Sequence, residues 1–141
     1  MLVAVKRVYE ASATSDGVRV LVDRLWPRGL TKRQAAVKHW LRDLAPSTEL
    51  RQWYHANPEA WRLFRKRYLK ELVSPKGSAA VEKLHGLAAS GKKLTLLYAS
   101  RNEERNNATV LKELLEGSPK PPSSVGRSAL GRGGIRKAKK E

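Results

Sequence analysis

Two segments of the chain are apolar at consecutive positions, which is the pattern of strands buried on both faces. VRVLVDRL predicts such a strand over residues 18–25, and KLTLLYA predicts another over 93–99. The loosely alternating LVAVKRVY predicts a strand over 2–9, and VKHWL predicts a short one over 37–41. The first two have the character of central strands in a sheet that other elements cover on both sides.

Helical patterns fill the segments between the strands. Thr31 is expected to cap a short helix over 32–36, and Ser47 to cap a helix through TELRQWYHA. Asn57 as N-cap, with Pro58 at the first helical position, predicts the start of a third helix. The apolar stripe of that third helix is Trp61, Phe64, Tyr68 and Leu72.

Two more helices are predicted in the second half of the chain. One covers 78–89, and its inward residues are Val81, Leu84 and Ala88. The last covers about 103–116, with Asn102 as a candidate N-cap and acidic residues in the first turn. Strands separated by helices predict the α/β class, a small mostly parallel sheet flanked by helices on both faces in a single domain.

Composition separates a folded body from a basic tail. The body is expected to span 1–117, because Gly117 suits the position after the last helix. Residues 118–141 are rich in Pro, Gly and Ser and carry seven cations against one acid. With so few large apolar side chains, this tail is predicted to be disordered.

Charge and cysteine content narrow the possible functions. The chain has 141 residues, 29 Lys and Arg against 13 Asp and Glu, and a net charge of +16, which favours anionic partners. It has no cysteine, so disulfides, thiolate nucleophiles and cysteine-bound metals are excluded. No signal peptide or membrane-length apolar run is recognisable, and we therefore expect a cytoplasmic protein without membrane partners.

Polar clusters follow both central strands, at the edge of a parallel sheet where ligands bind. DRLWPRG (23–29) ends the first, and YASRN (98–102) ends the second. Asn107 shares the inward face of the last helix at its N-terminal end. We therefore predict a pocket for a phosphorylated or nucleotide-like anion, with arginines as its bidentate partners. The predicted ligand-binding residues are Arg24, Arg28, Arg101, Asn106 and Asn107.

The same residues also have a structural interpretation. Asp23 could pair with a neighbouring arginine and fix the turn, and Asn107 could bond loop backbone. If the pocket is catalytic, Asp23 is the candidate general base and Tyr98 the candidate acid. No zinc-protease, phosphate-loop or serine-hydrolase motif is present, no metal site is predicted, and nothing in the pattern names a cofactor.

A second function class follows from the basic surface. The helix around Arg62, Arg65, Lys66 and Lys70 has a cationic face, and the tail adds a flexible run of cations. Such segments bind polyanions weakly, without sequence preference and with steep salt dependence. Non-specific association with nucleic acid is therefore the alternative to a small anionic ligand.

Several of these motifs are similar to those of one family. RVYE, DGVRVLVDRLWPRGL, LAPSTELRQWY, WRLFRKRYLKEL and LTLLYASRNEERNNATVL resemble the DUF488 domain in its YeaO-like branch, over roughly residues 3–116. The resemblance implies a small α/β cytoplasmic protein and brings no established reaction. Members often have an acidic residue where this chain has Asn102, and His where it has Arg105. The missing carboxylate argues against a metal or general-base role at position 102.

Overall fold

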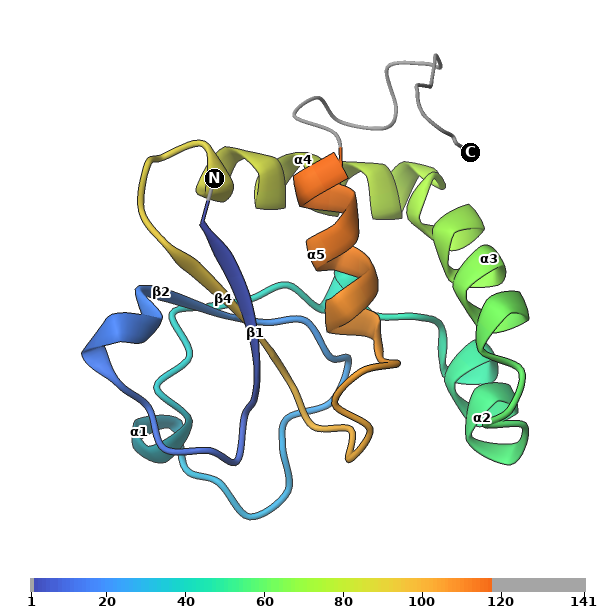
Figure 1. The fold of residues 1–141 in the computed structure, drawn as a ribbon, viewed down its shortest axis with the longest axis horizontal. Helices are drawn as coiled ribbons and strands as arrows, with labels where there is room; N and C mark the ends of the chain where they lie inside the picture. Colours follow the sequence, from blue (N-terminus) through green and yellow to red (C-terminus); the bar gives the residue numbers. More distant parts are fainter. Residues whose placement is uncertain (1, 118–141) are drawn as a thin grey trace.

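Four parallel strands form a single sheet in the computed structural model, which describes residues 2–117 (Figure 1). The strands lie in the order β1-β4-β2-β3, so the two consecutively apolar segments are the inner pair. Their bounds are β1 Val3–Arg7, β2 Val18–Leu21, β3 His39–Trp40 and β4 Leu94–Tyr98. All five residues of β4 are buried, as its apolar run predicts.

Within residues 2–117, five α-helices and two short 3-10 helices accompany the strands, which confirms a small single α/β domain. The α-helices are α1 Lys32–Ala35, α2 Thr48–Ala56, α3 Trp61–Leu72, α4 Pro75–Ala88 and α5 Asn107–Gly117. The 3-10 helices are η1 Thr14–Asp16 and η2 Arg42–Leu44. In Figure 1, α5 stands between the sheet and α3, and α4 runs across the top.

The sheet buries a different cluster on each face. Val20 and Leu96 belong to a large core that includes apolar residues of α2, α3, α4 and α5. Leu21 and Leu97 point to the other face, where Ala35 of α1 and the loop after β2 cover them. Helices thus lie on both faces, but α1 is a single turn and its face relies mainly on loops.

Local capping explains where several helices begin. The Thr31 hydroxyl accepts the Gln34 N–H at α1, and Ser47 accepts the Leu50 N–H at α2, as the sequence predicted. α4 begins at Pro75, earlier than the predicted 78, because Ser74 caps it by accepting the Gly77 N–H. The short strand 37–41 is confirmed as β3.

Two predicted caps were wrong, and in both the asparagine serves a neighbouring turn. Asn57 does not start α3; its side-chain amide donates to the Trp53 carbonyl and ends α2, and α3 begins at Trp61. Asn102 does not cap α5; its side-chain oxygen accepts two backbone N–H groups in the preceding turn. α5 begins at Asn107, and Asn106 accepts the Thr109 N–H in the capping position.

The strand predicted over 18–25 is shorter, since β2 ends at Leu21. Val22 still donates to the Leu97 carbonyl, and beyond it the Asp23 side chain, instead of a backbone carbonyl, accepts the Ala99 N–H. The chain is therefore free to turn away from the sheet at Asp23. The predicted disordered tail, 118–141, lies outside the described residues, and within 2–117 no helix is long and apolar enough to cross a membrane.

Candidate functional site

Asp23 lies where β2 and β4 end and joins the two strands through its side chain. Its Oδ2 accepts the Ala99 N–H at 2.9 Å, and its Oδ1 accepts the Asn107 side-chain amide at 3.0 Å. Its own carbonyl accepts the Trp40 indole N–H at 2.8 Å. Burial raises the pKa of Asp23 above its ordinary value, and the bonds from Asn107 and Ala99 and the charge of Arg51 offset this only in part.

Asn107 faces inward from the first turn of α5, as its spacing from the apolar stripe predicts. It is 9% exposed, and its amide nitrogen donates to the Val22 carbonyl at 2.9 Å as well as to Asp23. The structure therefore brings Asp23 and Asn107 together, over 84 residues of sequence. Asn107 thus bonds the backbone, as the structural interpretation of this residue predicted. Asp23 forms no ion pair with an arginine within residues 2–117, so that part of the interpretation is wrong.

A cavity of about 710 Å³ opens beside this pair, at the carboxyl ends of the strands. Its volume is in the range of small-molecule and cofactor sites. The loops after β1, β2 and β4 and the helix α2 contribute to its lining. Among the lining residues are six that the sequence singled out, namely Asp23, Arg24, Arg28, Arg101, Asn106 and Asn107.

Tyr98 and Asn106 are more buried than a ligand-contacting role requires. Tyr98 is 2% exposed and is not among the residues that line the cavity. Burial raises its pKa, with Glu103 and Glu10 adding to the rise, and its role as an acid stays a prediction. Asn106 lines the cavity at 3% exposure, but its amide is engaged by the Asn102 carbonyl and the Thr109 N–H.

Five arginines line the cavity, and none of them forms a salt bridge with a carboxylate of residues 2–117; they are Arg24, Arg28, Arg51, Arg101 and Arg105. Outside the cavity, Arg19 and Arg65 pair with carboxylates, and the remaining arginines of residues 2–117 form no salt bridge either. Arg24 donates weakly to the Ala45 carbonyl at 3.4 Å, and its buried Nε has no hydrogen-bond partner. Buried donors are nearly always satisfied, and within residues 2–117 one other buried side-chain atom, His85 Nε2, also has no partner.

Sequence reasoning missed two of these arginines and the aromatic walls. Arg51 lies on α2, whose pattern indicated only an apolar face, and Arg105 lies in the turn that had been assigned to the last helix. Tyr54 of α2 and Tyr9, which follows β1, complete the walls. Only the position of Tyr9 at the carboxyl end of a strand was a usable signal.

The two tyrosines hold the backbone of two cavity arginines. Tyr9 donates its hydroxyl to the Arg28 carbonyl at 2.9 Å, and Tyr54 donates to the Arg105 carbonyl at 3.5 Å. The Tyr54 ring is also stacked on Phe64, with 4.2 Å between the ring centroids. Because the bonded atoms are carbonyl oxygens, the guanidinium groups of both arginines stay available to a ligand.

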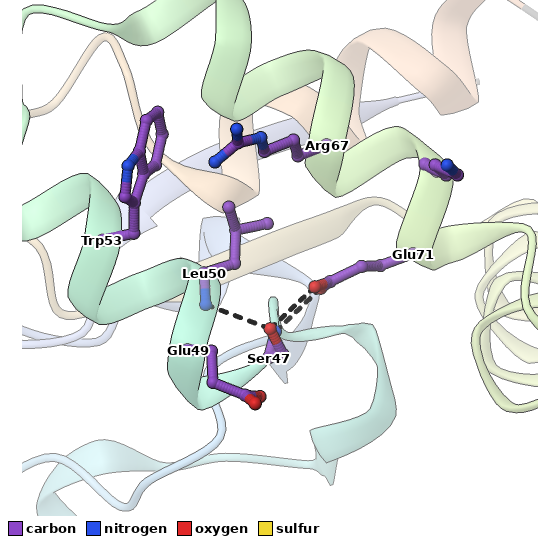
Figure 2. Close-up of a pocket in the computed structure, with 7 residues that line it drawn as sticks. Ser47, Glu49, Leu50, Trp53, Arg67 and Glu71 are labelled. Carbon is purple, nitrogen blue, oxygen red and sulfur yellow. Dashed lines mark hydrogen bonds between the residues drawn. The ribbon is translucent and has the colours of Figure 1, made fainter.

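A second hollow, of about 600 Å³, lies between α2 and α3 (Figure 2). In Figure 2, Glu71 reaches from α3 to Ser47, whose backbone N–H and hydroxyl donate to it at 2.8 and 2.7 Å. Arg67 lies over the Trp53 ring, 4.4 Å from its centroid. Two cations, Arg67 and Lys70, and two carboxylates, Glu49 and Glu71, line this hollow, so it has no excess charge to offer a ligand.

The cationic face of α3 is solvated, with one exception. Arg62, Lys66 and Lys70 are exposed, whereas Arg65 donates to the Glu113 carboxylate of α5 at 2.8 Å. No group of three or more His, Asp or Glu residues within 2–117 is arranged as a metal site.

Comparison with known proteins places the chain among relatives without an assigned activity. The family model described as the inactive DUF488-N3 subclade matches residues 2–124. An uncharacterised protein of Mycobacterium tuberculosis is 44% identical over 115 residues, which cover 82% of this chain and 94% of the relative. The uncharacterised protein YeaO of Escherichia coli is 41% identical over 115 residues, covering 82% and 97%. No solved structure matches the chain significantly.

Proposed function

Because the chain belongs to the inactive DUF488-N3 subclade of the DUF488 family, and because of its arginine-lined cavity, we propose that it binds a small phosphorylated anion. The ligand enters at the carboxyl ends of the strands, between the loops after β1, β2 and β4 and the helix α2. The family relationship and the YeaO-like relatives leave the reaction open, so the proposal depends on the geometry of the cavity.

One observation carries the proposal, namely five guanidinium groups around one cavity without a carboxylate partner in residues 2–117. Guanidinium groups bind phosphate and carboxylate oxygens through two parallel hydrogen bonds. Four of the five are exposed to solvent, so none is unusual by itself, and it is their gathering around one cavity that supports the proposal. An anionic ligand accounts for both the number and the placement of these side chains.

Binding without turnover fits Asp23 better than general-base catalysis does. Both of its carboxylate oxygens already accept hydrogen bonds, from the Ala99 N–H and from Asn107. A raised pKa is a common property of catalytic carboxylates, but here burial accounts for it. The description of the subclade as inactive agrees with a binding protein, for example a sensor of a phosphorylated metabolite.

A thermal-shift panel on the full chain tests the proposal with phosphate, pyrophosphate, sugar phosphates, nucleotides and small carboxylates. A ligand at 100 times its dissociation constant stabilises the fold by about 2.7 kcal/mol, which raises Tm by several degrees. Arg28→Ala should abolish that rise, because its exposed side chain lines the cavity while only its carbonyl bonds Tyr9.

The matched control is Arg62→Ala, which removes one exposed arginine of α3 outside the cavity. It changes the net charge by the same amount and should leave the ligand-induced rise intact. If no compound in the panel stabilises the protein, or if both variants lose the rise equally, the cavity is not the binding site.

The exposed cations of α3 favour a second candidate function, weak association with nucleic acid. The basic segment 118–141 adds to that capacity by its composition. Titration of a fluorescent single strand at several salt concentrations tests it, because phosphate contacts make the affinity fall steeply with salt. Arg62→Ala should then weaken binding as much as Arg28→Ala does, the opposite of the result expected for a cavity ligand.

A further inference from the structure

The cavity combines excess positive charge with aromatic walls, and this combination selects a narrower ligand class. We propose that the phosphorylated ligand is a nucleotide with two or three linked phosphates, a nucleoside diphosphate or triphosphate. This inference rests on the proposed function, since it requires that the cavity bind phosphate at all. It follows from three properties of the lining: its net charge, its size and the chemistry of its walls.

The net charge of the lining exceeds what one phosphate group balances. Five arginines face a single carboxylate, Asp23, so arginine exceeds carboxylate by four charges. A phosphate monoester carries at most two negative charges near neutral pH. Linked phosphates carry three or four charges in a short chain, which allows several guanidinium groups to be satisfied at once.

The arginines also come from different elements, which suits an extended anion. Arg24 and Arg28 belong to the loop after β2, Arg51 to α2, and Arg101 and Arg105 to the loop after β4. A single phosphate contacts only those guanidinium groups that converge on one point. A chain of phosphates can reach arginines on the separate loops that border the cavity.

The size and walls of the cavity leave room for a flat apolar group beside the phosphates. A volume of about 710 Å³ exceeds the needs of inorganic phosphate and lies in the range of drug-sized ligands. Tyr9, Trp26 and Tyr54 contribute aromatic surface to the lining, and Phe64 lies against Tyr54 at 2% exposure. Nucleobases stack on such rings, whereas sugar phosphates have no π-face to offer.

Tyr54 is an aromatic residue of the lining that lies next to a cavity arginine. It is fixed by stacking on Phe64 at 4.2 Å, and its hydroxyl lies 3.5 Å from the Arg105 carbonyl. The ring is therefore held next to one of the cavity arginines. A base that stacks on Tyr54 brings its phosphates within reach of the arginine side of the cavity.

Calorimetric titration of the full chain, at constant ionic strength, tests the ligand class with adenosine, AMP, ADP, ATP, CDP, pyrophosphate and fructose 1,6-bisphosphate. ADP and ATP should bind at least tenfold more tightly than AMP, and also more tightly than pyrophosphate or the sugar bisphosphate. Tyr54→Leu should weaken ADP about tenfold, as loss of one base–aromatic stack does, and leave pyrophosphate within twofold. Tyr54→Phe keeps the ring and loses only the long hydroxyl bond to the Arg105 carbonyl, so it should bind ADP nearly as tightly as the wild type does and is the reference for Tyr54→Leu.

The possible failures separate the two proposals. If pyrophosphate or the sugar bisphosphate binds as tightly as ADP, the nucleotide class is wrong and the anion-binding function stands. If ADP binds but Arg62→Ala weakens it as much as Arg28→Ala, binding is to the general basic surface and both proposals fail. If no phosphorylated compound binds, both fail as well. The comparison of ligands on the wild type decides the class even if Tyr54→Leu does not fold.

Discussion

Asn107→Ala tests the junction between β2, β4 and α5 that forms the floor of the cavity. The substitution removes a donor to the Val22 carbonyl at 2.9 Å and to the Asp23 carboxylate at 3.0 Å. A neutral hydrogen bond contributes about 1 kcal/mol and one to a charged group about 1.5–3 kcal/mol, so the expected loss is about 3 kcal/mol. Domains of this size are stable by roughly 5–15 kcal/mol, and the variant should therefore still fold.

Urea denaturation at pH 7 measures this loss of unfolding free energy. In a separate thermal melt, Tm should fall by about 10 °C. A double-mutant cycle with Asp23→Ala isolates the bond between the two side chains, which should couple by about 1.5–3 kcal/mol. Independent effects, with coupling below about 0.5 kcal/mol, would refute the assigned bond.

The pH dependence of Asn107→Ala gives a second check, and its sign follows from the raised pKa of Asp23. An acid whose folded pKa lies above its unfolded value costs stability once it is ionised, and this cost disappears as pH falls through the folded pKa. Without the Asn107 donor the folded pKa of Asp23 rises further. The deficit of the variant should therefore be larger at pH 7 than at about pH 4, and a deficit independent of pH would contradict this account.

Two further substitutions test the structural contacts outside the cavity. Asp16→Asn should destabilise the protein by about 3 kcal/mol at pH 7, because it leaves the buried Arg19 without its carboxylate. Burial opposes ionisation of Asp16, but hydrogen bonds from Ala13, Lys6 and Arg19 lower its pKa overall. The stability that the ionised Asp16 adds to the wild type is therefore lost as pH falls below about 4. Acid titration of both proteins should show their free energies of unfolding converge. Tyr68→Phe should cost about 1–2 kcal/mol in urea denaturation, because the buried hydroxyl donates to the Leu44 carbonyl, and an unchanged midpoint would mean that this bond contributes nothing.

The sheet could be predicted from the sequence because its signal is local and repeated. Consecutive apolar residues marked β2 and β4 as inner strands, and the sheet order places them there. Ser47 and Thr31 were predictable caps because each hydroxyl bonds an N–H group three residues ahead. Such patterns need no knowledge of the rest of the fold.

The asparagine caps could not be predicted with the same rules. Asn57 and Asn102 have the right composition for an N-cap, but each also completes a turn with nearby backbone groups. The choice between these roles depends on where the next helix packs, which is a tertiary property. For Asn102 the outcome extends the loop after β4, and this loop brings Arg105 to the cavity.

The candidate site was predictable where a residue follows a strand, and unpredictable where a helix supplies it. Asp23, Arg24 and Arg28 could be located because the carboxyl ends of parallel strands meet at one edge. Arg51 and Tyr54 reach the same edge only because α2 packs beside the strand-end loops. No periodicity in α2 distinguishes these two residues from other residues at its surface.

The gathering of five arginines at one cavity supports its interpretation, since arginines without a salt bridge are common in the rest of residues 2–117 as well. Arg19, which is buried, has a carboxylate partner, and Arg65, which is half-exposed, has one as well. At the cavity, the one acid bonds an amide and a backbone N–H. A second acid opposite the arginines would relieve their repulsion and would also compete with the anionic ligand that we propose, and Asp23 is the one carboxylate in the described lining.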